Sequence, residues 1–105
     1  MEHVLDVAAY VCGRFYETTG KRIDEMKLHK LLYLSQREML SVTDEPLFEE
    51  SLEGWKYGPV SPLVRGHFDD GAINAKTGEI SDPARYIVNN VLDELIEQSV
   101  ALVGK

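Results

Sequence analysis

The chain has 105 residues, of which 44% are hydrophobic and 28% are charged. This length supports one core, and the composition is that of a folded globular domain. With 11 basic and 18 acidic residues the net charge is −7, which argues against general binding to nucleic acid, because a phosphate backbone requires a basic face.

Cysteine usage and hydropathy indicate where the protein resides. The single cysteine, Cys12, excludes an internal disulfide and fits a reducing compartment. No apolar run reaches the length of a membrane span, and the acidic N-terminus lacks the basic region of a signal peptide. We therefore expect a cytoplasmic protein without a membrane segment.

The first predicted element is a helix over about residues 3–17. Gly20 follows as a helix stop, because glycine readily takes a positive φ. Cys12 lies on the apolar face and is interpreted as a core residue. That face recurs at three- and four-residue spacing and comprises Val4, Leu5, Ala8, Val11, Cys12 and Phe15.

A second helix, over about residues 25–40, is predicted to be central and buried. Asp24 is a good N-cap, and Ile23 is placed to pack on Leu28 as a hydrophobic staple. His29 is expected on the polar side. The apolar positions occupy so much of the circumference that we expect other elements on several sides. They are Leu28, Leu31, Leu32, Ser35 and Met39 on one face, widened by Met26, Tyr33, Leu34 and Leu40.

An acidic run follows the central helix. Residues 44–53 contain five carboxylates and no Lys or Arg, namely Asp44, Glu45, Glu49, Glu50 and Glu53. Such a run is usually solvated surface, and the functional alternative is a patch that attracts a basic partner. The apolar residues among these acids fit either a short helix or an irregular segment.

Residues 54–62 predict a rigid bend. Gly58 precedes Pro59, and a residue before proline is pushed toward extended backbone. Trp55 and Tyr57 have two interpretations of equal weight. Either they pack as a lid over the central helix, or they are half-exposed anchors for a protein partner.

Two more helices complete a mainly α prediction. Ser61 and Pro62 suit the N-cap and first position of a helix over about residues 62–69, with Leu63, Val64 and Phe68 toward the core. A turn-like sequence is compatible with a small β-hairpin near residues 72–80. Asp82 and Pro83 then suit the N-cap and first position of a helix over about residues 83–103. Its apolar stripe comprises Tyr86, Ile87, Val88, Val91, Leu92, Leu95 and Leu102.

No motif for catalysis or metal binding emerges. The chain lacks a phosphate-binding loop, paired histidines at metal spacing and a nucleophile elbow. We therefore expect no metal, no cofactor and no enzymatic activity. A hydrolase that uses the acidic run is the least favoured alternative, because exposed carboxylates lack the shifted pKa of a catalytic acid. The apolar central helix also argues against reading of DNA bases.

Three linked motifs resemble one family. Residues 27–36, KLHKLLYLSQ, resemble the pattern K-L-x-K-L-L-Y-x-x-Q. Residues 46–48 resemble the P-L-F that follows it, and residues 55–62 resemble W-x-x-G-P-V-x-P. In this order and spacing they resemble the Panacea antitoxin domain, also called the SocA-like or phage-associated GepA-type domain, over about residues 4–104. The motif positions expected to shape the domain are Leu28, Leu31, Leu32, Gly58, Pro59 and Pro62.

The resemblance implies a mostly helical antitoxin that neutralises a protein toxin by direct binding. The alternative that it implies is an adaptor or scaffold that delivers a partner to a protease. Family members usually continue beyond the last helix, so we expect one domain over residues 1–105 without that C-terminal segment. The oligomeric state does not follow from the sequence.

The predicted partner-binding residues combine aromatic anchors with the acidic run. Toxins that act on RNA or nucleotides tend to carry basic sites, so the acidic residues are expected to steer such a toxin. The predicted set is Tyr33, Gln36, Asp44, Glu45, Glu49, Glu50, Glu53, Trp55 and Tyr57.

Overall fold

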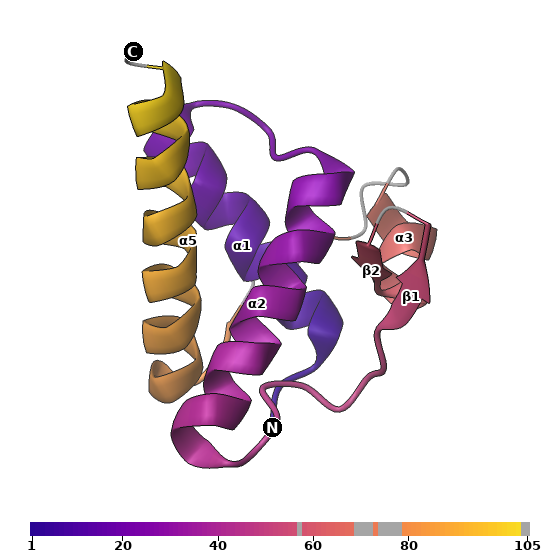
Figure 1. The fold of residues 1–105 in the computed structure, drawn as a ribbon. Helices are drawn as coiled ribbons and strands as arrows, with labels where there is room; N and C mark the ends of the chain where they lie inside the picture. The colour runs from indigo at the N-terminus through magenta and orange to yellow at the C-terminus, as the bar shows by residue number, and fades with distance from the viewer. Residues whose placement is uncertain (57, 69–72, 74–78, 104–105) are drawn as a thin grey trace.

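The computed structural model describes residues 1–56, 58–68, 73 and 79–103, with side chains to residue 97. These residues form four helices and one two-stranded antiparallel sheet. Figure 1 shows α2 in front of α1, with α5 on one side and the sheet and α3 on the other. The mainly α prediction with a central helix is confirmed. The elements are α1 (Val4–Thr19), α2 (Glu25–Thr43), β1 (Glu53–Trp55), β2 (Gly58–Val60), α3 (Pro62–Phe68) and α5 (Asp82–Val103).

Helix α1 ends at the predicted stop. Gly20 is left-handed at φ 72°, and its N–H donates to the Tyr16 carbonyl at 2.8 Å. The buried face of α1 joins the core through Val4, Val7, Ala8, Ala9, Val11 and Cys12. The Tyr10 hydroxyl also donates to Asn89 Oδ1 on α5 at 2.7 Å, which fixes the two helices against each other.

Helix α2 is buried along one face only. The Asp24 carboxylate accepts a hydrogen bond from the Lys27 N–H at 2.8 Å, so the predicted N-cap is confirmed. The buried residues are Leu28, His29, Leu31, Leu32, Ser35 and Met39. The expectation of a wider buried surface is wrong, because Met26, Tyr33 and Leu40 are 64%, 39% and 42% exposed. Helices α1 and α5 and strand β2 cover only part of the helix circumference.

The chain between α2 and α3 contains a β-hairpin where the sequence predicts only a bend. Strands β1 and β2 pair in antiparallel register, with Glu53 opposite Val60 and Trp55 opposite Gly58. Residues 49–52 have no helix, so the irregular alternative for this segment is the observed one. The hairpin expected near residues 72–80 falls mostly outside the described residues, although Ile73 is described and buried.

The last two helices begin with similar caps. Ser61 Oγ accepts the Val64 N–H at 3.3 Å and thereby starts α3, as predicted. Ser81 Oγ accepts the Ala84 N–H at 3.4 Å, so Ser81 takes the capping role expected of Asp82.

Two residues predicted to face the core do not. Leu63 of α3 and Tyr86 of α5 are exposed. Each lies on a side of its helix that no other described element covers. The side chain of Leu102 lies outside the described residues. No helix in the described part of the chain is both long and apolar enough for a bilayer.

Candidate protein-binding site

Gln36 attaches the segment after α2 to the helix itself. Its Oε1 accepts the N–H groups of Leu47 at 2.6 Å and Phe48 at 3.2 Å, and its Nε2 donates to the Phe48 carbonyl at 3.0 Å. Leu47 and Phe48 are fully buried, so these backbone groups have no access to water. Gln36 therefore positions the chain that leads into the hairpin, and its hydrogen-bonding groups are used inside the domain.

His29 attaches the residue that follows the hairpin to α2. Its Nδ1 accepts the Ser61 N–H at 3.2 Å, which leaves the ring proton on Nε2 to be donated to Glu25 Oε2 at 3.0 Å. The same Glu25 oxygen accepts from Arg65 of α3 at 3.1 Å. The expectation that His29 lies on the polar side of α2 is wrong, because the imidazole is buried and accepts from the backbone N–H of Ser61.

These two attachments leave a groove between α2 and the hairpin. It consists of two adjoining pockets of about 390 and 470 Å³, which share Met26 and Pro59. We call it the α2–hairpin groove. Its remaining lining residues are Glu25, Lys27, His29, Lys30, Tyr33, Leu34, Trp55, Lys56, Val60 and Arg65.

Two of the predicted aromatic anchors lie in this groove. Trp55 is 43% exposed, and its indole N–H donates to Glu53 Oε1 at 3.0 Å. The Arg65 guanidinium lies over the Trp55 ring, 4.9 Å from its centroid, and Arg37 lies similarly over Tyr33 at 5.7 Å. Both rings are thus held in place with one face available, as in the anchors of protein interfaces.

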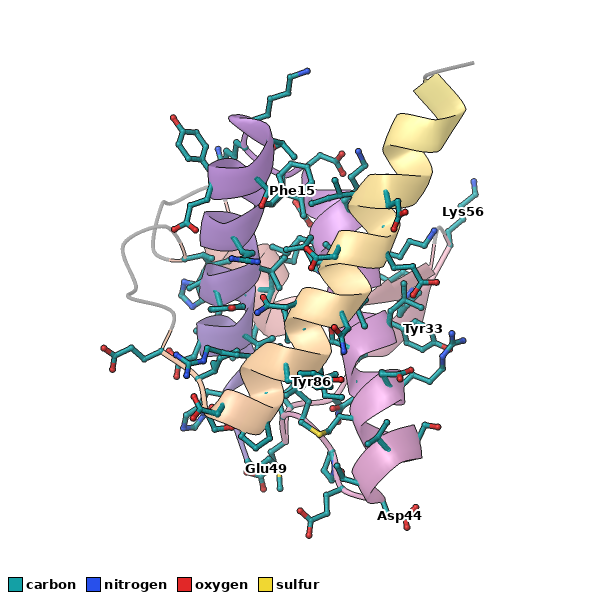
Figure 2. The ribbon with its side chains drawn as sticks, turned by 90° about the vertical axis from the view of Figure 1, so that its left-hand side faces the viewer. Phe15, Tyr33, Asp44, Glu49, Lys56 and Tyr86 are labelled. Atoms are coloured by element: carbon teal, nitrogen blue, oxygen red, sulfur yellow. The ribbon has the colours of Figure 1, made fainter. Side chains whose placement is uncertain are left out.

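The five predicted acidic residues do not form one patch. Glu53 is bonded to Trp55 at the groove, whereas Asp44 and Glu45 lie exposed at the C-terminal end of α2. Figure 2 shows Asp44 and Glu49 at one end of the molecule, away from Tyr33 and Lys56, which share another edge. We call the exposed set of Asp44, Glu45 and Glu49 the acidic end.

Glu50 has a role inside the domain. His3 provides no side-chain cap for α1, and Glu50 Oε1 instead accepts the Val4 N–H at 3.1 Å, while Oε2 lies 3.2 Å from His3 Nδ1. Burial raises the pKa of the Glu50 carboxyl, but hydrogen bonds from its own backbone, His3 and Val4 outweigh this, so the pKa lies below 4.5. Glu50 is therefore a charged cap for the positive end of the α1 dipole.

Sequence reasoning identifies Tyr33 and Trp55 but misses their surroundings. Met26 and Arg65 line the groove, yet the sequence pattern places Met26 in the core and gives Arg65 no role. The spacing of Met26, Lys30 and Tyr33 along one face of α2 is the signal that finds this strip. Tyr57 lies outside the described residues.

Cys12 and the metal-ligand side chains are the remaining candidates for chemistry. Burial raises the pKa of the Cys12 thiol to about 11, against a smaller lowering by Arg22, so the thiol stays protonated. Among the described residues, no group of three or more His, Cys, Asp or Glu side chains is placed to hold a metal ion.

A family profile described as antitoxin SocA-like, Panacea domain, matches residues 28–100. The chain belongs to this family. Comparisons with curated proteins and with solved structures found no match. In this Panacea domain the three sequence motifs meet in space. Gln36 of the first motif binds the backbone of the second, and His29 of the first motif binds the backbone of the third at Ser61.

Proposed function

We propose that this Panacea domain is an antitoxin that binds a cognate protein toxin directly through the α2–hairpin groove. Family membership supports the antitoxin role. The observation that carries the choice of surface is the pair of half-exposed rings, Trp55 and Tyr33, held beside exposed Met26. Aromatic side chains fixed by neighbouring groups lose little entropy on binding, and they dominate the energetics of many interfaces.

The proposed mechanism is stoichiometric binding without catalysis. The toxin is blocked because a rigid helix and a rigid hairpin cover part of its surface, and no bond is made or broken. The acidic end contributes separately, since exposed carboxylates accelerate association with a basic toxin and act less at high salt. In this proposal the groove sets the lifetime of the complex, and the acidic end sets the rate at which the complex forms.

Co-expression with the product of the adjacent gene tests this proposal. The neighbour alone should stop growth, and this domain should restore growth. The double variant Tyr33→Ala, Trp55→Ala should weaken binding by about 2 kcal/mol or more and lose the rescue. Tyr86→Ala is the matched control, because Tyr86 is an exposed aromatic residue on α5, outside the groove.

Three outcomes contradict the proposal. The first is a neighbour that is harmless alone, and the second is equal rescue by the groove variant and the wild type at equal stability. The third is rescue at a small fraction of the toxin's molar amount, which would indicate catalysis. The half-life of the toxin should also be unchanged in the complex, since faster degradation would favour a protease adaptor.

A further inference from the structure

The α2–hairpin groove carries a charge opposite to that of the chain. The whole chain has a net charge of −7, yet the groove is lined by Lys27, Lys30, Lys56 and Arg65. Among its described lining residues the one carboxylate is Glu25, and Glu53 beside the groove accepts from the Trp55 indole. A single Glu25 oxygen already accepts from both His29 and Arg65, so the Glu25 carboxylate is engaged by groups other than Lys27 and Lys30.

Apolar and cationic side chains alternate along the open strip of α2. Met26, Lys30 and Tyr33 follow each other at four- and three-residue spacing and so lie on one face. Lys27 joins the same pocket as Lys30 and Tyr33, and Leu34 and Pro59 complete its apolar part. An apolar side chain placed in this pocket would therefore lie beside Lys27 and Lys30, of which Lys27 has its ammonium over the Phe15 ring of α1, 6.0 Å from the centroid.

The combination of apolar and cationic side chains in the groove indicates what kind of partner segment would bind there. We infer that the groove receives an acidic segment of the partner, in which one or two apolar side chains are flanked by Asp or Glu. The apolar side chains pack on Met26, Tyr33 and Trp55, and the flanking carboxylates pair with Lys27 and Lys30. This inference rests on the proposed function for the identity of the partner as a toxin.

A nucleic acid is the other polyanion that a basic groove attracts. The groove offers no continuous basic face to a duplex, because the surface between its lysines is apolar. The acidic end, on the same small domain, would also repel a long phosphate chain. A partner segment with carboxylates next to apolar side chains matches both the lysines and the apolar surface of the groove.

Phage display of short random peptides can test this inference, because it does not require the toxin to be identified. The full chain is immobilised, and enriched peptides are sequenced and synthesised. Their affinities are then measured for the wild type, for Lys30→Glu and for Lys21→Glu. Lys21→Glu is the matched control, because Lys21 is an exposed lysine in the α1–α2 connection and the charge change is identical.

The enriched peptides should be acidic with at least one large apolar residue. Lys30→Glu should weaken their binding about tenfold, Lys21→Glu by less than about twofold, and added salt should weaken binding to the wild type. Enrichment of basic or neutral peptides, equal effects of the two variants or no enrichment would overturn the inference. Binding of random single-stranded RNA that is lost in Lys30→Glu would overturn it in favour of nucleic acid.

The growth assay separates this inference from the proposed function. Failure of toxin rescue together with acidic peptide binding would remove the antitoxin proposal and leave the chemistry of the groove intact. Full rescue by Lys30→Glu, with no loss of affinity for the toxin, would retain the antitoxin and reject the acidic segment.

Discussion

At the scale of single residues, two polar side chains that are expected to contact a partner serve the fold instead. Gln36 makes three hydrogen bonds to the backbone of Leu47 and Phe48. Glu50 caps a helix that begins 46 residues earlier in the chain. The sequence pattern predicts both as partner contacts. The sequence names a Gln or a Glu but does not show whether its side chain binds another protein or the backbone of its own chain. Only the fold distinguishes these two roles.

Replacement of Gln36 by Ala should destabilise the domain by about 1–3 kcal/mol. The buried N–H groups of Leu47 and Phe48 would lose their acceptor and pay the cost of desolvation. Urea unfolding followed by tryptophan fluorescence measures the change. Glu38→Ala, an exposed site on the same helix, is the control and should stay within about 0.5 kcal/mol of the wild type. Equal effects of the two substitutions would show that the Gln36 contacts contribute nothing.

Glu50→Gln should make stability less dependent on pH. The folded-state pKa of Glu50 is lowered, so its charge stabilises the fold above pH 4.5, and this contribution is lost as the pH falls through the folded pKa. Near neutral pH the variant should be less stable by about 0.5–1 kcal/mol, and below pH 4.5 the gap should close.

Unfolding free energies of wild type and variant at neutral and acidic pH provide the measurement. Glu49→Gln is the matched control, since Glu49 is the exposed neighbour of Glu50, and it should match the wild type at neutral pH. A gap between Glu50→Gln and wild type that is constant with pH would reject the charged cap.

At the scale of elements, the β-hairpin is the part that creates the groove. A two-stranded hairpin of three residues a side is marginal alone. It is supported here because His29 binds Ser61 directly after β2, and Gln36 binds the segment that leads toward β1. Gly58 permits the turn back toward α2, because its φ of 125° is a conformation that side chains rarely adopt.

Gly58→Ala should destabilise the hairpin by about 1–2 kcal/mol through backbone strain. Gly54→Ala is a close control. Gly54 lies in the facing strand at negative or extended φ, and a Cβ at either glycine meets no atom within 4 Å. The control should therefore change stability by less than about 0.5 kcal/mol. Trp55 fluorescence during urea unfolding reports on both, and similar losses in the two variants would exclude strain as the cause.

At the scale of the whole molecule, α2 separates a core from a binding surface. One side contacts α1 and α5 and supplies the fully buried leucines, and the other side carries Met26, Tyr33 and Leu40. Short stretches of α2 therefore combine residues whose loss affects stability with residues whose loss affects binding.

Two leucines on α2 test this division. Leu32 is fully buried, so Leu32→Ala should cost about 2–5 kcal/mol through lost contacts and a cavity. Leu40→Ala removes the same atoms from a half-exposed position and should cost less than about 1 kcal/mol. Thermal and urea unfolding measure the stability of both variants. Comparable losses of stability would mean that the exposed face of α2 is covered in solution.

Features that depend on neighbours along the chain can be predicted from the sequence. Helix spacing, the Asp24 and Ser61 caps and the Gly20 stop follow from contacts within a few residues, and each of them is confirmed. The linked motifs also indicated the family. Tertiary structure alone decided which apolar residues are exposed and which polar residues are used internally. Those outcomes depend on which elements cover which side of a helix, and contacts such as His29 to Ser61 join residues 32 positions apart.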